Sequence, residues 1–211
     1  MLNLLSTANQ RSGRLVEAED CLRQSLEIRH RIDDVRGQAS CLVNLGYVLV
    51  EAGRAAEAVG VLESALETFR GISLKGGERV ALANLGEAHK ALGSLEVALT
   101  HYNAAFAIGR VTEDPANLGR DLVNLADVLC MLGRLPQAAE YAAQGHARCT
   151  QTGNRVDQAI AADVLGQVQD AAGHKAEALG HWLEARSILE ELGHHRVHDV
   201  AARIRNLQPE H

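Results

Sequence analysis

Aromatic residues are scarce in this sequence, at 3% of 211 residues, and it holds only three prolines. Strands favour aromatic and β-branched side chains, so the first scarcity argues against a β-sheet protein. The second leaves long helices uninterrupted, because proline breaks helix interiors. Hydrophobic residues still make up 46% and are mostly Ala, Leu and Val, which suits closely packed helices. The composition predicts an all-α fold.

The chain also lacks an excess of positive charge and any long apolar run. Its formal net charge is −6 and it has no basic block, so we expect no direct contact with nucleic acid. No apolar stretch approaches the roughly 20 residues that cross a bilayer, and residues 1–10 do not resemble a signal peptide. The scattered cysteines, which form no CxxC pair, are Cys21, Cys41, Cys130 and Cys149. We interpret them as reduced thiols in a cytoplasmic protein that binds no membrane.

A repeat of 40 residues is the main positive feature of the sequence. The tripeptide Asn-Leu-Gly at 44–46 returns at 84–86, and in altered form at 124–126 and 164–166. Glycines keep the same step, at Gly13, Gly53, Gly93, Gly133 and Gly173. A fixed period of this size indicates a solenoid, in which each repeat buries its apolar face only against its neighbours.

Each repeat is predicted to form two helices, which we call A and B. In the second repeat, Leu42, Leu45 and Leu49 give residues 39–51 one apolar stripe at helical spacing. Gly53 follows where a left-handed residue ends the helix. A second stripe over 55–69 predicts helix B. We expect loops with helix starts between repeats, at 33–34, 75–77, 112–115 and 152–154.

Glycine inside helix A has a packing explanation. The glycine of Asn-Leu-Gly costs about 1 kcal/mol relative to alanine in a helix, so its return implies that helix B approaches closely there. We expect the partners across the gap to be the alanines at the matching position of helix B. These pairs are Gly46 with Ala58, Gly86 with Ala98, Ala126 with Ala138, and Gly166 with Ala178.

The repeat register predicts a single domain over 1–211. Its repeats span approximately 1–32, 33–74, 75–113, 114–153 and 154–193, the first of them incomplete. Met1 falls inside a helix A of this register, so we expect the chain to come from a longer protein. Residues 195–207 lack the Asn-Leu-Gly signature and alternate apolar with charged positions, which predicts a terminal helix that caps the array.

The spacing of leucines, glycines and alanines resembles the tetratricopeptide repeat. The matching positions are Leu42, Leu45, Gly46, Gly53, Ala58, Leu62 and Ala65 in the second repeat, and Leu82, Leu85, Gly86, Gly93, Ala98, Tyr102 and Ala105 in the third. The fourth repeat departs at Ala126, Ala142 and Gly145, and the fifth at Ala162, with Trp182 as its large helix-B residue. The resemblance implies a right-handed superhelical solenoid of helix-turn-helix units.

A narrower likeness follows from repeat length. The usual unit has about 34 residues, whereas this one has 40. Such 40-residue units resemble the C-terminal repeats of Streptomyces antibiotic regulatory proteins and related bacterial signalling ATPases, and also those of kinesin light chains and spindle-orienting scaffolds. The Ala-, Gly- and Arg-rich composition favours the bacterial group. The resemblance implies a protein- or peptide-binding module, acting as the sensory or regulatory arm of a larger transcription regulator or ATPase.

The resemblance places the residue before the packed leucine of helix A on the inner, concave surface. Asparagine there offers two donors and one acceptor, which match the backbone of an extended peptide. Equally, each Asn could bond a neighbouring helix or loop and only fix repeat spacing. Acids outnumber bases at the nearby positions, which favours a basic or neutral ligand. The predicted binding residues are Asn44, Tyr47, Glu51, Asn84, Glu87, Lys90, Arg120, Asn124, Asp127, Asp163 and Gln167.

Other chemistry finds little support in the sequence. His194 and His198 could share a helix face and bind a metal, but a solvent-exposed cap explains them better, and we predict no metal or other cofactor. No cysteine or serine has a partner that spacing fixes, so we predict no enzyme. Trp182 is expected to fill the core between the fifth repeat and the cap. The partner would be a protein, a peptide or another domain of the same polypeptide; the alternative is self-association into a homo-oligomer.

Overall fold

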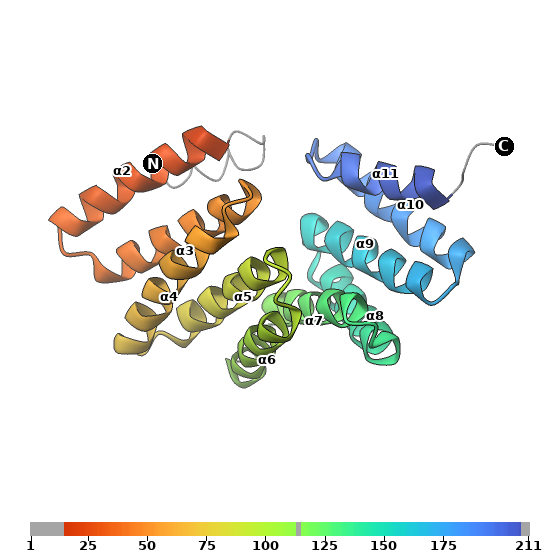
Figure 1. The fold of residues 1–211 in the computed structure, drawn as a ribbon, viewed down its shortest axis with the longest axis horizontal. Coiled ribbons are helices and arrows are strands. Elements are labelled where there is room, and N and C mark those ends of the chain that lie inside the picture. Colours follow the sequence, from red (N-terminus) through yellow and green to blue (C-terminus); the bar gives the residue numbers. More distant parts are fainter. Residues whose placement is uncertain (1–14, 113–114, 208–211) are drawn as a thin grey trace. The chain divides into compact units, whose positions relative to one another are not determined.

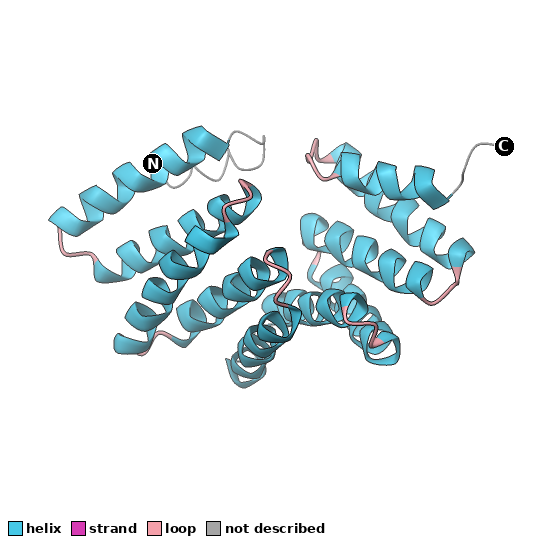
Figure 2. Ribbon diagram, viewed as in Figure 1, coloured by secondary structure: helices cyan, strands magenta, loops and turns pink. Residues whose placement is uncertain are grey.

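The computed structural model describes residues 15–112 and 115–207, and every regular element in these ranges is a helix (Figure 2). Figure 1 labels the helices α2 to α11. Their bounds are α2 Leu15–Arg31, α3 Val35–Glu51, α4 Ala55–Gly71, α5 Lys75–Ala91, α6 Leu95–Thr112, α7 Pro115–Met131, α8 Leu135–Thr152, α9 Arg155–Ala171, α10 Lys175–Glu191 and α11 Val197–Leu207. This confirms the predicted all-α helical-hairpin repeat. The helix that Met1 was expected to begin in lies outside the described residues.

The helices form two compact units, one ending at Thr112 and one beginning at Glu113. We call them the N-terminal and the C-terminal unit. Within each, every helix packs against the next along the chain, and helices A of successive repeats also touch, α3 with α5 and α7 with α9. The border between the units, after Thr112, lies one residue before the predicted border between the third and fourth repeats.

The turn inside each hairpin follows the prediction from glycine spacing. Gly53, Gly93, Gly133 and Gly173 all have φ between +73° and +86°, the left-handed region that glycine enters without steric cost. The turns that follow α2, α4, α8 and α10 repeat the same conformation with other residues. Asp33 and Ser73 take positive φ there, as do Gly153 and Gly193.

The prediction of a loop at residues 75–77 is wrong, because α5 already begins at Lys75. Two consecutive glycines suggested a loop, but they have different roles inside the first helical turn. A β-carbon on Gly76 would meet open space, whereas one on Gly77 would collide with the Phe69 ring. Gly77 therefore lets the end of α4 pack on the start of α5. Helix α3 likewise begins at Val35, four residues earlier than the apolar stripe indicated.

Close approach of helices A and B is observed, but its partner differs from the prediction. A β-carbon on Gly46 would lie 2.5 Å from Leu62, and one on Gly86 or Gly166 would lie 2.6 Å from the ring of Tyr102 or Trp182. The helix-A glycines thus accept the large helix-B side chain, one turn beyond the alanine expected to fill the gap. The fourth repeat has alanine at both matching positions, Ala126 and Ala142.

The core of each unit continues through these contacts. In the N-terminal unit, Leu22, Leu49, Leu62 and Leu85 belong to one buried cluster. In the C-terminal unit, Trp182 and Leu189 of α10 pack with Val200 and Ile204 of α11. The terminal helix thus buries one apolar face, as expected of a cap.

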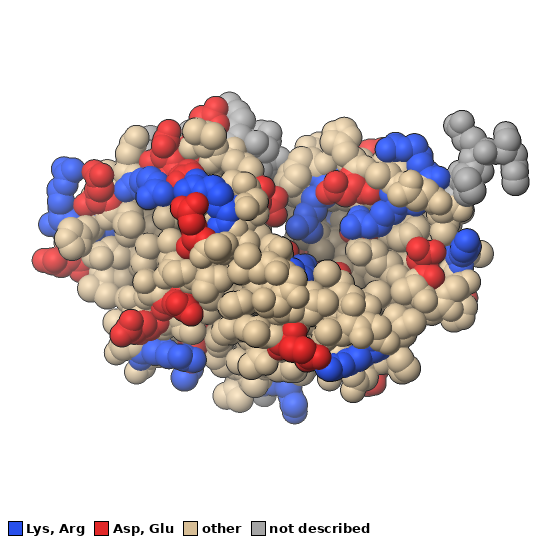
Figure 3. Space-filling view, in the orientation of Figure 1, with Lys and Arg blue, Asp and Glu red and all other residues tan. Residues whose placement is uncertain are grey.

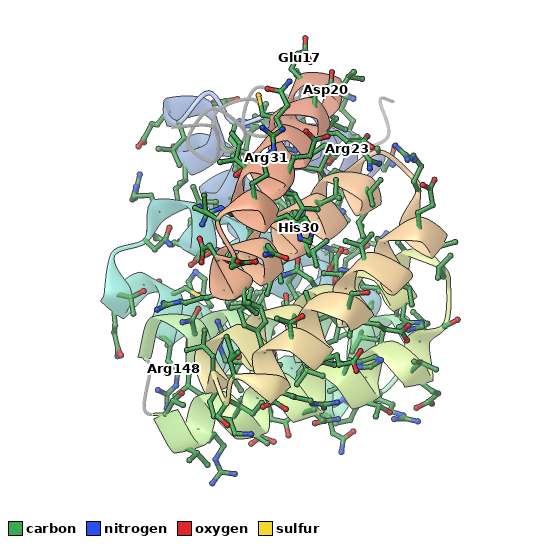
Figure 4. All side chains as sticks on the ribbon, turned by 90° about the vertical axis from the view of Figure 1, so that its left-hand side faces the viewer. Glu17, Asp20, Arg23, His30, Arg31 and Arg148 are labelled. Carbon is green, nitrogen blue, oxygen red and sulfur yellow. The ribbon has the colours of Figure 1, made fainter. Side chains whose placement is uncertain are left out.

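Charged side chains cover the outside of the hairpins. Figure 4 shows Glu17, Asp20 and Arg23 projecting from α2, where all three are exposed. Figure 3 shows acidic and basic side chains interspersed on the face in view rather than gathered by sign. Such mixed surfaces are typical of solvated helix faces, and they give phosphate groups no concentrated positive field.

Candidate ligand-binding faces of the A helices

The three predicted asparagines lie on helices A, each next to a buried leucine of the Asn-Leu pair. Asn44 on α3, Asn84 on α5 and Asn124 on α7 are all half-buried. Asn84 Nδ2 donates to the carbonyl of Val80 in its own helix at 2.9 Å. Within the described residues, the amides of Asn44 and Asn124 bond to no other group. None of the three bonds a neighbouring helix there, so the amides of Asn44 and Asn124, and the groups of the Asn84 amide that Val80 does not use, remain available to a ligand.

Two predicted residues of α5 also hold the hairpin together. Glu87 accepts a 2.8 Å hydrogen bond from the hydroxyl of Tyr102, whose ring is 1% exposed. Lys90 Nζ lies 2.9 Å from the same carboxylate. A buried phenol requires a partner, so Glu87 stabilises the A–B contact as well as facing the A-helix surface. On α3, Tyr47 and Glu51 are half-buried, and each takes part in an interaction inside the molecule.

Arg120 joins two A helices, although 50% of its side chain is exposed. Its Nε donates to Oδ1 of Asp157 at 3.0 Å, across the interface between α7 and α9. Asp157 is buried, and Nδ2 of Asn154, the N-cap of α9, donates to its other oxygen at 2.8 Å. The ion pair and the cap therefore hold the start of α9 against α7. The sequence showed the charge of Arg120 but not this partner, 37 residues away.

Asp163 makes the corresponding contact between α9 and α11. Nη1 of Arg203 donates to both carboxylate oxygens at 3.1 Å, and the Asp163 side chain is 15% exposed. Burial raises the pKa of Asp163 to about 6, against the opposing pull of Arg203 and Arg196, and the nearby carboxylates Asp127 and Asp199 raise it further. Asp127 is half-buried on α7. Arg203 follows Asp163 by 40 residues, which is one repeat length.

A cavity of about 450 Å³ lies beside this contact. Gln167, the last of the predicted residues, lines it from α9 with Asp170, and Lys175 and Trp182 line it from α10. The terminal helix supplies Arg203 and Asn206. Sequence reasoning treated this helix only as a cap and missed its part in the cavity. The 40-residue step from Asp163 to Arg203 was the signal that could have revealed it.

Cys130 of α7 also lines this cavity, whereas the other described cysteines and the described histidines do not. His194 and His195 stack with ring centroids 4.5 Å apart, and in the described residues no group of three or more potential ligands could hold a metal ion. Burial raises the pKa of the Cys149 thiol to about 11, and it also raises the pKa of Cys130. Neither thiol is therefore poised as a nucleophile. No helix among those described is long and apolar enough to span a bilayer.

A family model described as the tetratricopeptide repeat matches residues 1–71, 77–147 and 121–191. The chain belongs to the tetratricopeptide repeat family. The helical hairpins, turn glycines and A–B contacts described above are thus those of a tetratricopeptide repeat array, a fold that serves as a protein-interaction scaffold.

One relative found by sequence and two solved structures with a similar fold can be compared with this tetratricopeptide repeat chain. Regulatory protein AfsR of Streptomyces griseus is 26% identical over 219 aligned residues, which cover 90% of the chain but only 22% of AfsR. A Rap protein complexed with Competence and Sporulation Factor shares the fold at a TM-score of 0.72 and 16% identity, over 98% of this chain and 62% of that one. A signal transduction ATPase with a tetratricopeptide repeat sensor, from Pyrococcus horikoshii, has a TM-score of 0.66 and 15% identity, over 97% and 36%.

Proposed function

We propose that this chain recognises a protein or peptide through its A helices and serves as the regulatory repeat arm of a larger bacterial transcription regulator or signalling ATPase. The relative AfsR is a regulatory protein, and the chain spans about a fifth of its length. In the Pyrococcus ATPase the tetratricopeptide repeats are a sensor, and the Rap protein binds a competence and sporulation factor. The partner of this chain would be a separate protein or peptide, or another domain of the same polypeptide. A cytoplasmic location remains a prediction.

The observation that carries the proposal is the state of the A-helix amides. The side chains of Asn44, Asn124 and Gln167 are half-buried, and in the described residues no protein group bonds to them. A half-buried amide has lost part of its contact with water, so a ligand that completes its hydrogen bonds loses little on desolvation. The backbone of a peptide supplies both the donors and the acceptors that such amides need. This recognition would not depend strongly on the sequence of the peptide.

Charge at the predicted binding residues favours a basic or neutral ligand over an acidic one. The two cations are already engaged, Lys90 by Glu87 and Arg120 by Asp157. Among the predicted binding residues the acids outnumber these cations, and they are Glu51, Glu87, Asp127 and Asp163. An acidic ligand would therefore meet like charge without a free cation to offset it.

Amide substitution provides the direct test. Peptides selected from a random-sequence display library on the purified chain would be titrated calorimetrically into the parent and into the double variant Asn84→Ala, Asn124→Ala. We expect the double variant to bind at least about tenfold more weakly, since each lost hydrogen bond costs about 1 kcal/mol. Asn103→Ala is the matched control, because Asn103 Nδ2 also donates to the carbonyl four residues earlier, at 2.9 Å, but from the exposed face of α6.

Oligomeric state separates this proposal from the alternative of self-association. The molar mass of the parent and of the double variant would be measured by light scattering as each elutes from a size-exclusion column, over a range of concentrations. Recognition predicts that the oligomeric state stays the same while peptide affinity falls. If the variants bind peptide as the parent does, and substitutions on the outer faces of the B helices dissociate an oligomer, then assembly is the function and the proposal is wrong.

A further inference from the structure

The cavity beside α11 differs from the rest of the A-helix surface in the charges that face it. Lys175 and Asp170 both line it, and their side chains form no ion pair with each other or with any described residue. At the same positions the earlier repeats carry other residues. The equivalents of Lys175 are Ala55, Leu95 and Leu135, and those of Asp170 are Val50, Lys90 and Cys130. The combination of a lysine and an aspartate at these two positions is therefore particular to the hairpin of α9 and α10.

Amides supply further hydrogen-bonding capacity to the same cavity. Gln167 from α9 and Asn206 from α11 line it, and neither side-chain amide has a bonding partner among the described residues. Each amide can donate and accept, so the cavity presents both hydrogen-bond donors and acceptors from α9 and from α11. Asn206 stands where the other repeats have Gly46, Gly86, Ala126 and Gly166, so this polar group too is confined to the end of the array.

Arg203 retains donors after pairing with Asp163. Only its Nη1 is used in that pair, where it contacts both carboxylate oxygens. Its Nε and Nη2 are not bonded to any described residue. A guanidinium already held in place by a buried carboxylate is oriented without further loss of side-chain freedom, which favours binding of an anion. Lys175 and Arg203 therefore form the cationic part of the cavity, and Asp170 the anionic part.

We propose that this cavity binds a small zwitterion of the amino-acid type, with its carboxylate at Lys175 and Arg203 and its ammonium group at Asp170. A ligand of a single charge sign would leave either the cations or the carboxylate without a counter-ion, whereas a zwitterion satisfies both. The amides of Gln167 and Asn206 suit the peptide bond of a dipeptide. A volume of about 450 Å³ is enough for one amino acid or a short peptide and lies in the usual range for small-molecule pockets.

Trp182 allows ligand binding in the cavity to be detected on the intact chain. It is the single tryptophan of the sequence, it lines the cavity, and its indole Nε1 donates to the carbonyl of Asp163 at 3.2 Å. Its emission and its indole N–H resonance should respond to a ligand in the cavity. The probes are the free amino acids and a set of unblocked dipeptides, each also supplied N-acetylated and as the C-terminal amide. We expect the Trp182 emission and the indole N–H resonance to change saturably with at least one unblocked probe. Blocking its ammonium group by acetylation, or its carboxylate as the amide, should weaken binding about tenfold.

The two probe classes distinguish the sources of the zwitterion. Tighter binding of a free amino acid would identify a metabolite-type ligand, and tighter binding of a dipeptide would identify a peptide ligand; both outcomes support the proposal. Absence of any saturable change in emission and in the indole resonance across the probe set would overturn it. So would equal affinity for blocked and unblocked forms, because the cavity would then not select charge.

Substitutions test whether the proposed residues bind the probe. Lys175→Gln and Asp170→Asn should each weaken the best probe about tenfold, the first through the carboxylate and the second through the ammonium group. Arg205→Gln is the control for the cation, since Arg205 lies on α11, is exposed and does not line the cavity. Glu177→Gln is the control for the acid, as an exposed residue of α10.

Unchanged affinity in Lys175→Gln and Asp170→Asn would contradict the assignment even if the probe binds. The inference stands apart from peptide recognition by the asparagines. Asn84→Ala and Asn124→Ala alter residues outside the cavity and should leave the probe's affinity unchanged.

Discussion

Single glycines decide how closely the two helices of a repeat approach. Gly86 lies against Tyr102, whose ring is almost fully buried and whose hydroxyl is bonded to Glu87. The ring is thus fixed at both ends and cannot move aside for an added methyl group. In the fourth repeat the small side chains move to other positions of the same interface, where Gly145 packs against Val123 and Gly119 against Cys149.

A methyl group at Gly86 should therefore destabilise the protein. We expect Gly86→Ala to lower the free energy of unfolding of the N-terminal unit by about 2 kcal/mol through overpacking, even though alanine is the better helix former. The control is Gly60→Ala in α4, where a β-carbon would meet nothing within 4 Å and should add about 1 kcal/mol of stability. Chemical denaturation followed by circular dichroism checks both. A stabilising Gly86→Ala would show that the glycine is not required by packing.

At the scale of helices, α11 completes the array by a mixed apolar and ionic contact. Val200 and Ile204 enter the core beside Trp182, while Arg203 pairs with Asp163. The earlier repeats have Val43, Ala83 and Val123 at the position of Asp163. Here a charge is buried instead, and its desolvation is only partly offset by the arginine, which is why the pKa of the carboxyl is raised.

The raised pKa predicts how the contact responds to pH. In the folded state Asp163 has a pKa of about 6, against an ordinary value of 3.8, so between these values the folded protein binds the extra proton. Its contribution to stability is then greatest near pH 4 and is lost as pH rises through 6. The loss is about 3 kcal/mol for a shift of roughly two pKa units.

Asp163→Asn cannot titrate and provides the comparison. The free energy of unfolding of the parent, minus that of the variant, should fall as pH rises from 4 to 7. The difference isolates Asp163 from Glu78, whose pKa is lowered by Lys75 and Arg70 and whose contribution has the opposite sign. A difference that does not change with pH, measured by denaturation at closely spaced pH values, would show that burial does not govern this carboxyl.

At the scale of the whole chain, the contacts divide into two units. Each helix stabilises mainly its neighbours within its own unit, as expected of a repeat protein whose stability is a sum over repeats and their interfaces. A local defect should therefore stay local. This property sets repeat arrays apart from domains with a single shared core.

Hydrogen exchange can test that division. Gly46→Ala places a methyl group against Leu62, so we expect faster amide exchange in α3, α4 and α5 of the N-terminal unit. Amides of α9 and α10 should keep their parent protection. Gly166→Ala, which faces Trp182, is the reciprocal variant and should produce the opposite pattern. Uniform loss of protection along the chain in either variant would mean that the two units unfold as one.

The sequence by itself determined the repeat, the helical hairpin and the turn glycines. These features depend on local backbone preference and on a period that recurs every 40 residues, so they can be seen without distant contacts. Close approach at Gly86 could be inferred for the same reason. The identity of its partner could not, because Ala98 and Tyr102 lie one turn apart on the same face of helix B.

Tertiary structure alone decided which charged side chains are engaged with one another. Arg120 meets Asp157, and Arg203 meets Asp163, across pairs of helices separated by a whole repeat. Whether Asp170 and Lys175 pair with each other or face a common cavity depends on side-chain directions that spacing does not specify. Local preference fixes where a helix begins and ends, whereas the docking of one helix on another decides which polar groups remain for a ligand.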